Sequence, residues 1–525
     1  MPFLSVLFYA HGSYNKIMKN KVIVSASIVT GLSVAERFLG FLYRIVLSRL
    51  LGAEGLGLYQ IALSLFGLFA VVGSGGIPIT VSRIISKSKA EHDLAGERRA
   101  VGAGIAACLI LTLPFCLILG LFGGKFTFLF SDDRAFNVFR ILLLGLAFSS
   151  VYAVIRGHFW GNKEFLTPSV LEIAEESVMV IAGIFLLRNV TSPLAGAEKA
   201  AWAVVISYLF SFTASLLCFF FKGGKIHSPK GTLKPMFSSA LPITSVRASG
   251  SLVNSAVAIL LPVMLMRAGA DRSTAMKLFG VVSGMVLPVL FIPSTVIGST
   301  ALVLVPELSE DYYRGNTERL RINLERGLRF SLLVACMLIP FFYALGADVG
   351  RLAFSNPTAG KMIQKSCLIL LPMSLTMIST SMLNAMGFEK QTFLFFFFGA
   401  AALLICILIL PNVCGVYAYL IGLGISYVVT AACNLFFLRK QGFLFQKDGG
   451  RVRDHALFIP LFAVLPFSML GRICNNLFKL FLGELFAVAA TTTVLAFATF
   501  FLYLALGYIP VKKFRLPRKA KRRKT

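Results

Sequence analysis

Three arginines lie inside segments of the chain that are otherwise strongly apolar. Arg37 and Arg44 occur in VAERFLGFLYRIV, and Arg247 occurs in SVRASGSLVN, which ends at Asn254. Seven residues are about two helical turns, so Arg37 and Arg44 share one helix face, about 10 Å apart along the axis. A guanidinium stays charged when it is desolvated and can bind two phosphate oxygens at once. The spacing therefore favours a site for a phosphate-bearing ligand, with Arg247 as a third cation and Asn254 as a weaker polar candidate.

Four glutamates also occur in apolar segments. Glu36 directly precedes Arg37, and Glu172, Glu175 and Glu176 occur together in TPSVLEIAEESVMV. Glu172 and Glu176 are four residues apart and share a helix face. The group could couple proton or cation movement to a functional cycle, or pair with the arginines. Acids in the first turns of a helix are also stabilised by the helix dipole, so a structural role stays open.

The composition requires most of the chain to face lipid. The 525 residues are 57% hydrophobic and only 14% charged, whereas an ordinary soluble domain has about 25% charged residues. Forty-nine Phe residues against two Trp also suit a lipid-facing surface. The sequence therefore predicts an all-α polytopic membrane protein.

The composition also argues against several functions. The formal net charge is +28, but no basic run is interleaved with a nucleic-acid recognition module, so we expect no nucleic-acid partner. In a membrane protein, excess Lys and Arg are typical of cytoplasmic loops and of contacts with anionic lipid. Nine scattered Cys and five His, without a CxxC pair, predict neither a disulfide framework nor a metal site. No phosphate loop or nucleophile elbow occurs, so we expect no cofactor and no enzymatic activity.

Apolar runs long enough to cross a bilayer, which takes about 20 residues, indicate fourteen spans. By residue number they are 22–48, 56–82, 100–122, 137–160, 166–187, 200–221, 236–266, 278–305, 330–346, 362–387, 391–410, 415–438, 455–471 and 484–508. An even number places both termini on one side of the membrane. Most of the 51 Lys and Arg residues then lie on that side, which the positive-inside rule assigns to the cytoplasm. We predict a multi-pass protein with both termini in the cytoplasm.

A membrane setting gives each cationic or amide candidate a structural alternative. Arg44 could extend to the external interface, and Arg247, early in its span, could be an interfacial anchor. Arg37 could pair with a carboxylate that holds two helices together. Asn254 could form a hydrogen bond with a neighbouring helix. The sequence leaves these alternatives open.

An internal repeat divides the predicted spans. RFLGFLYR, residues 37–44, aligns with RASGSLVN, residues 247–254, and HFWGNKEF, residues 158–165, aligns with NAMGFEKQ, residues 384–391. Two matches in the same order at similar offsets indicate two parallel, pseudo-symmetric six-helix lobes, an arrangement typical of transporters. The predicted organisation is a cytoplasmic tail (1–21), an N-lobe (22–222), a C-lobe (233–440), two extra spans (454–508) and a polybasic cytoplasmic tail (509–525).

Glycine and proline interrupt corresponding spans of the two lobes. The second span contains VVGSGGIPIT, with Gly76 and Pro78, and the eighth contains VLPVLFIPSTVIGST, with Pro293 and Gly298. Interrupted spans at matching positions point to a binding site or to moving hinges. The same residues could instead permit close helix packing. Gly76, Pro78, Pro293 and Gly298 are our hinge candidates.

Four long motifs resemble the stage V sporulation protein B family. They are RFLGFLYRIVLSRLLGAEGLGLYQ (37–60), GGIPITVSRIISK (75–87), RGHFWGNKEFLTPS (156–169) and SGMVLPVLFIPSTVIGSTALVLVPELSE (283–310). That family belongs to the polysaccharide-exporter branch of the multidrug/oligosaccharidyl-lipid/polysaccharide (MOP) flippase superfamily and is related to the MurJ-like lipid II flippases.

The resemblance implies a fold, a place and a substrate class. It implies a V-shaped, two-lobed flippase of about fourteen helices that works by alternating access in the bacterial cytoplasmic membrane. The implied substrate is a polyprenyl-pyrophosphate-linked cell-wall saccharide, above all a peptidoglycan precursor for spore cortex or cell wall. Cell-wall synthesis proteins are an implied partner class, anionic lipids are expected at the basic tail, and we expect a monomer.

The resemblance also bears on single residues. Arg37 matches an arginine of the first-helix motif of MurJ-like proteins, with Glu36 in place of a serine, and Arg44 is similar to a second one. MurJ-like proteins have basic residues deep in the second and eighth helices, whereas this chain is uncharged over 56–82 and 278–306.

Two other functions compete with this hypothesis. A flippase for another polyprenyl-linked polysaccharide unit would share the mechanism. A cation-coupled multidrug exporter of the same fold would favour membrane-embedded carboxylates in both lobes, and Glu36 would suit that function. A polytopic scaffold or biosynthetic enzyme has the least support from the residues.

Overall fold

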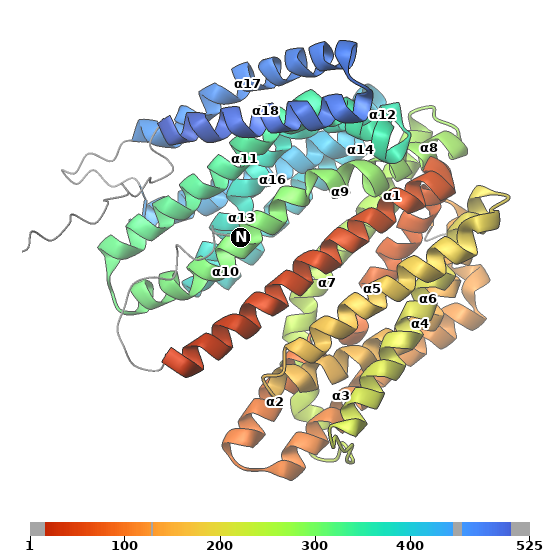
Figure 1. The fold of residues 1–525 in the computed structure, drawn as a ribbon. Helices are drawn as coiled ribbons and strands as arrows, with labels where there is room; N and C mark the ends of the chain where they lie inside the picture. Colours follow the sequence, from red (N-terminus) through yellow and green to blue (C-terminus); the bar gives the residue numbers. More distant parts are fainter. Residues whose placement is uncertain (1–15, 128–129, 445–453, 506–525) are drawn as a thin grey trace, which may run out of the picture. The chain divides into compact units, whose positions relative to one another are not determined.

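The structure is a computed structural model that describes residues 16–127, 130–444 and 454–505 (Figure 1). The described residues are helical almost throughout and contain no β-strand, as the all-α prediction requires. The longer helices are α1 (Lys16–Ser74), α2 (Ile77–Ala90), α3 (Leu94–Leu121), α4 (Asp133–Gly161), α5 (Leu166–Leu186), α6 (Pro193–Phe221), α7 (Leu233–Arg267), α8 (Arg272–Gly280), α10 (Ile292–Tyr313), α11 (Thr317–Phe354), α12 (Pro357–Ser366), α13 (Leu370–Ala385), α14 (Glu389–Ile409), α16 (Tyr417–Lys440), α17 (Asp454–Phe481) and α18 (Glu484–Ala505). Short turns are η1 (Gly123–Lys125), η3 (Leu187–Asn189), η4 (Val281–Val286), α9 (Leu287–Leu290), η5 (Cys367–Ile369) and α15 (Pro411–Cys414).

The helices form two compact units. The first contains Met1–Pro288 and Leu404–Tyr419, and the second contains Val289–Leu403 and Leu420–Thr525. The predicted lobes, 22–222 and 233–440, are defined by the internal repeat and stay a prediction.

Twelve helices in the described part of the chain are long and apolar enough to cross a membrane, so the predicted number of fourteen is approximate. Predicted spans 22–48 and 56–82 fall in one candidate, Ile28–Ala90, whereas predicted span 278–305 is divided between Arg272–Leu290 and Ile292–Tyr313. Helix α5 is not among the candidates because three glutamates interrupt its apolar run. Much of predicted span 455–471 and all of the tails 1–21 and 509–525 lie outside the residues with described side chains.

A glycine divides the long first helix. Helix α1 has 59 residues and would measure about 90 Å if it were straight, whereas a bilayer core is about 30 Å thick. Gly52 has φ 66° and ψ 179°, a backbone conformation that glycine adopts without steric cost. The interruption separates the residues of the first predicted span from those of the second.

Proline marks two further helix breaks. Helix α1 ends at Ser74 and α2 begins at Ile77, with Pro78 in its first turn. Helix α9 ends at Leu290 and α10 begins at Ile292, followed directly by Pro293. Proline suits the first turn of a helix because it lacks an N–H that would need an acceptor there. The interruptions expected from sequence are therefore present, and their action as hinges stays a prediction.

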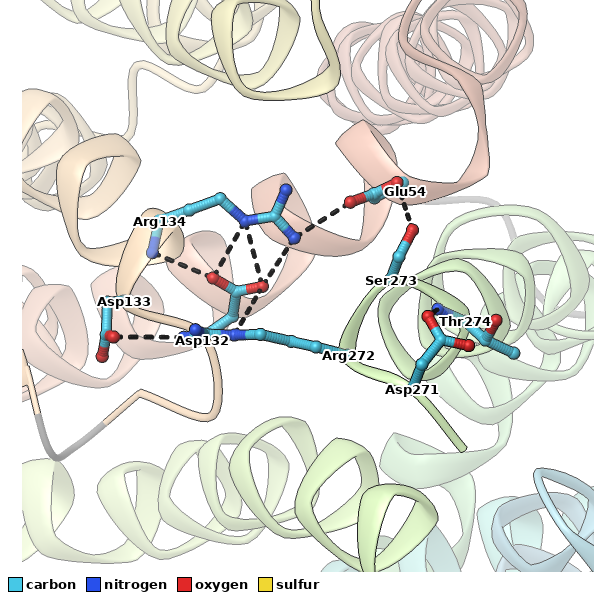
Figure 2. A network of polar contacts seen from close by, with 8 residues as sticks. All are labelled: Glu54, Asp132, Asp133, Arg134, Asp271, Arg272, Ser273 and Thr274. Carbon is cyan, nitrogen blue, oxygen red and sulfur yellow. Dashed lines mark hydrogen bonds and ion pairs between the residues drawn. The ribbon is translucent and has the colours of Figure 1, made fainter. Parts of the chain in front are cut away.

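Three loops assigned to the external side by charge meet at one end of the first unit. Figure 2 shows Glu54, which follows the Gly52 interruption, beside Arg134 at the start of α4 and Ser273 at the start of α8. Asp132 and Asp271 accept hydrogen bonds from the backbone N–H groups of Arg134 and Thr274 and so cap α4 and α8.

Loops assigned to the cytoplasmic side also meet one another. Lys222 forms an ion pair with Glu164, and the N–H of His227 donates to the carbonyl of Arg98. The helices of this unit therefore alternate in direction as the charge pattern predicts, and which end is cytoplasmic stays a prediction.

Glycines allow α1 and α8 to touch closely at the end of this unit where Glu54, Arg134 and Ser273 meet. A Cβ on Gly280 would lie 2.0 Å from the carbonyl oxygen of Ala53, and one on Gly57 would lie 2.2 Å from that of Met276. Close approach through small residues is the usual way in which membrane helices gain packing energy. This crossing therefore fixes α8 beside the second half of α1.

A buried ionic network holds the last helices of the second unit. Asp348 of α11 is buried and lies 2.5 Å from Lys479 Nζ and 2.5 Å from Asn475 Nδ2, both on α17. Arg351 also binds Asp348, and it pairs with Glu484 of α18. Helices α17 and α18 therefore pack along α11 (Figure 1) through matched charges as well as apolar contact.

Candidate functional site

The first-helix arginines are exposed on α1. Tyr43 is buried against Gly183 of α5, where a Cβ would lie within 2.1 Å of the tyrosine hydroxyl. The adjacent Arg44 is exposed, as is Arg37, and Arg44 forms no ion pair within 4 Å in the described part of the chain. Packing of Tyr43 therefore fixes the rotation of α1 so that its arginines face away from the packed side.

A carboxylate of α5 lies beside Gly40, which falls between the two arginines in the sequence. A Cβ on Gly40 would be 2.8 Å from Glu176 Oε1, so this glycine allows Glu176 to approach the α1 backbone. Glu176 also interacts electrostatically with Arg44. The space beside Gly40 on this side of α1 is therefore occupied by Glu176.

Arg156 of α4 is a site residue that sequence reasoning missed. Its Nη1 lies 2.9 Å from Glu172 Oε1, and the two side chains are 29% and 23% exposed. Its guanidinium also lies 5.0 Å from the ring centroid of Trp160 and 5.7 Å from that of Tyr152, within the range of a cation–π contact. Arg156 lies near the end of predicted span 137–160, and no local pattern in the sequence links it to Glu172.

The remaining glutamates belong to the same cluster. Glu36 interacts electrostatically with Glu172 and with Arg156. Glu175 Oε2 is buried without a hydrogen-bond partner among the described residues. The structure thus brings together all four predicted glutamates and adds Arg156. We name the set Glu36, Arg44, Arg156, Glu172, Glu175 and Glu176 the α1–α5 charge cluster.

The α7 candidates have different surroundings. Arg247 donates from Nη1 to the carbonyl oxygen of Gly75, at 3.0 Å, and the rest of its side chain is exposed. Asn254 is seven residues further along and also exposed, so the pair repeats the spacing of Arg37 and Arg44. A substrate contact for either residue stays a prediction.

The four hinge candidates have different environments. Gly76 and Pro78 are buried, and Gly76 touches the backbone of α7, because a Cβ there would lie 2.3 Å from the carbonyl oxygen of Ala240. Gly298, in contrast, has nothing within 4 Å of an added Cβ. Close helix packing therefore explains why position 76 is a glycine, but it does not explain the glycine at position 298.

The described residues form no cluster of the kind that binds a metal ion. Within residues 16–127, 130–444 and 454–505, no group of three or more His, Cys, Asp or Glu side chains could hold a metal ion. The chemistry that the α1–α5 charge cluster offers is ion pairing with a charged ligand and exchange of small cations or protons.

Solved structures with a similar fold are membrane transporters. The chain matches a structure of the lipid II flippase MurJ in an inward closed conformation with a TM-score of 0.66 and 15% identity, over 91% of this chain and 99% of that one. It matches an inward-facing multidrug resistance MATE transporter of the MOP superfamily with a TM-score of 0.66 and 15% identity, over 77% and 94% of the two chains. The fold is therefore that of these multi-pass helical membrane proteins.

Sequence comparison gives the family. Residues 22–311 match the family described as "Polysaccharide biosynthesis protein", and the chain belongs to this family. It is 25% identical to stage V sporulation protein B of Bacillus subtilis (strain 168) over 357 residues, which are 65% of this chain and 67% of that protein. It is 24% identical to the lipid II flippase MurJ of the same strain over 367 residues, 65% of this chain and 66% of that one. The resemblance expected from the four motifs is confirmed, and the matched parts span about two thirds of these relatives.

Proposed function

We propose that this protein is a flippase for a polyprenyl-pyrophosphate-linked saccharide, with a peptidoglycan precursor for cell wall or spore cortex as its substrate. Its family and its likeness to a lipid II flippase and to a sporulation protein support this substrate class. The proposed place is the bacterial cytoplasmic membrane, with both termini in the cytoplasm. The proposed unit is a monomer that needs no cofactor.

The observation that carries the proposal is the exposed pair Arg37 and Arg44 on one face of α1. A pyrophosphate that crosses a medium of low dielectric constant needs counter-charge along its path. Two guanidinium groups about two turns apart can bind its oxygens in succession while both stay charged. Asn254 on α7 is proposed as a further contact for the same headgroup.

The glutamates of the α1–α5 charge cluster are proposed as coupling groups. Glu176 lies beside Gly40 and acts on Arg44, so it can neutralise this arginine when no substrate is bound. A pyrophosphate would compete with this carboxylate, and a proton or a small cation would then balance the released negative charge. Glu36, Glu172 and Glu175 would take part in the same way around Arg156: a carboxylate released from this arginine would take up a proton or a small cation. Movement of the helices is assigned to the breaks at Gly76–Pro78 and at Pro293, with Gly298 as a further flexible point.

Two partner classes complete the proposal. The basic tail after residue 508 carries many Lys and Arg residues and would bind anionic lipid at the cytoplasmic surface. Enzymes of cell-wall synthesis, which make and use the lipid-linked substrate, are the proposed protein partners.

Transport in proteoliposomes tests the proposal. A fluorescent polyprenyl-pyrophosphate saccharide is placed in both leaflets, and a membrane-impermeant quencher reports how quickly the inner pool reaches the outer leaflet. We expect the wild type to accelerate this exchange and Arg37→Ala and Arg44→Ala each to slow it at least tenfold. The matched control is Arg83→Ala, on the exposed surface of α2.

The outcome separates the competing functions. Wild-type rates in both α1 variants would overturn the cationic site. A saccharide without amino sugars that moves faster than the peptidoglycan precursor would favour another polysaccharide unit. Efflux of a cationic dye that needs Glu36, without movement of any polyprenyl lipid, would replace the proposal with a multidrug exporter.

A further inference from the structure

The break between α1 and α2 leaves backbone groups inside the protein that need new partners. In a continuous helix the N–H of Gly76 would donate to the carbonyl of Val72, and the carbonyl of Gly75 would accept from Ile79. In the structure the N–H of Gly76 donates to Thr244 Oγ1 at 3.0 Å, and the carbonyl of Gly75 accepts from Arg247 Nη1 at 3.0 Å. Both partners are side chains of α7.

These contacts are built into the helix crossing. Gly75, Gly76 and Thr244 are buried, and the Gly76–Thr244 hydrogen bond is fully enclosed. Thr244 and Arg247 are three residues apart on α7 and so share a face. Thr244 supplies the acceptor for the N–H of Gly76, and Arg247 supplies the donor for the carbonyl of Gly75. The two side chains thus satisfy both backbone groups that the break leaves unpaired.

The contact between these helices continues along their length. Ser255 Oγ of α7 donates to the carbonyl oxygen of Ser64, at 2.8 Å, in the unbroken part of α1. The carbonyl of Ala240 lies against Gly76, with room for a hydrogen but not for a methyl group. Helix α7 therefore follows the second half of α1 as far as the break.

A membrane core offers little water to form hydrogen bonds with a broken helix, so an unpaired backbone group there is strongly unfavourable. We propose that Thr244 and Arg247, which we name the α7 clamp, are positioning residues that hold the interrupted second span against α7. In this role Arg247 acts through the backbone of Gly75 and not through the substrate. The part of the proposal that concerns transport rests on the proposed flippase function, whereas the clamp itself does not.

Hydrogen exchange tests the clamp without any substrate. The purified protein in lipid nanodiscs is labelled in D₂O, and exchange is followed in peptides that cover residues 71–82. We expect Thr244→Val and Arg247→Gln to exchange about five to ten times faster than the wild type in this segment, as the loss of one buried hydrogen bond predicts. Arg247→Lys, which keeps a donor of similar reach, should restore most of the protection.

Two variants of the same helix serve as matched controls. Ser249→Ala removes a hydroxyl that donates to the carbonyl of Ser245 within α7, and Arg267→Gln removes an exposed arginine at the end of α7. Both should leave exchange over 71–82 unchanged. Wild-type exchange in Thr244→Val and Arg247→Gln would overturn the proposal.

Transport by the same variants separates positioning from substrate binding. We expect Thr244→Val and Arg247→Gln to lower the maximal translocation rate at least threefold and to leave the half-saturating substrate concentration unchanged. Arg247→Gln with normal exchange and a raised half-saturating concentration would make Arg247 a substrate contact and overturn the proposal. If the wild type moves no polyprenyl lipid, the flippase function fails, and the exchange result still decides the clamp.

Discussion

Arg272 Nε lies 3.2 Å from Asp132 Oδ2, an ion pair that joins the start of α8 to the cap of α4 (Figure 2). Arg134 Nη2 lies 2.8 Å from the same oxygen and 2.9 Å from Glu54 Oε1. The side chain of Asp132 is fully buried. One carboxylate thus connects α4 and α8 and, through Arg134, the segment after the Gly52 interruption.

Asp132→Asn should destabilise the first unit strongly. The change leaves Arg134 and Arg272 without their buried counter-charge, which should cost about 3 kcal/mol in the free energy of unfolding. The thermal midpoint of the purified protein in detergent should fall accordingly. Asp133→Asn is the matched control, since Asp133 pairs with the same Arg272 but is 67% exposed, and its loss should cost less than about 1 kcal/mol. Equal shifts for the two variants would contradict the assignment.

Acid should remove the contribution of ionised Asp132 to the stability of the fold. Burial opposes ionisation of this carboxyl, but hydrogen bonds from the side chain and backbone of Arg134 outweigh it and hold the pKa below its usual range. Because the folded pKa is lower than the unfolded one, ionised Asp132 stabilises the fold above about pH 4, and this stabilisation is lost as the pH falls through the folded pKa. The difference in thermal midpoint between wild type and Asp132→Asn should therefore be constant near neutral pH and shrink below about pH 4. A difference that grows in acid would be evidence against this account.

Arg156 and Glu172 should show coupled effects on stability. Both side chains of this ion pair are largely buried from solvent. A double-mutant cycle with Arg156→Ala and Glu172→Ala should therefore give a coupling free energy of about 1 kcal/mol. Chemical denaturation monitored by tryptophan fluorescence is unsuitable because Trp160 lies beside Arg156, so circular dichroism should be used. The exposed pair Lys222–Glu164 provides the comparison and should give a smaller value. Strictly additive single effects at Arg156 and Glu172 would mean that the contact contributes nothing.

Two glycine substitutions should have opposite effects. Gly280→Ala places a methyl group 2.0 Å from the carbonyl of Ala53, so α1 and α8 must separate, at a cost of about 1–3 kcal/mol. Gly298→Ala meets nothing within 4 Å and should stabilise α10 by about 0.5–1 kcal/mol. If Gly298 is a flexible point of the transport cycle, the same variant should slow translocation despite its higher thermal midpoint. An unchanged transport rate would remove Gly298 from the hinge candidates.

Local patterns predicted most of the helices and both proline breaks. Apolar runs and Ile-Pro pairs are signals that lie within a few residues, so the interruptions at Pro78 and Pro293 could be expected from sequence. The π-helical turn η4 carries no comparable signal, because an apolar run such as VVSGMV suits an α-helix equally well. The two-part nature of α1 followed from the separate apolar runs 22–48 and 56–82, whereas the backbone conformation of Gly52 did not.

The candidate site was predictable by residue type and not by contact. Charged residues in apolar segments are costly, and this identified Arg37, Arg44, Arg247 and the glutamates. Which of them meet depends on how helices cross. Glu172 binds Arg156 across the α4–α5 loop, and Arg247 lies 172 residues from its acceptor Gly75. No regular spacing in the sequence links such partners. The α7 clamp and the position of Glu176 beside Gly40 could therefore be identified only from the structure.

The network around Asp348 has a consequence for the synthesis of the chain. Asp348 and Lys479 are 131 residues apart, and a ribosome adds about 5–20 residues per second. On the order of 10 s therefore pass between the synthesis of α11 and that of Lys479, which neutralises the buried Asp348. Among the described residues, Arg351 is the ion-pair partner of Asp348 that is made before this lysine. Nascent chains stalled before α17 should thus be a preferred target for membrane quality control.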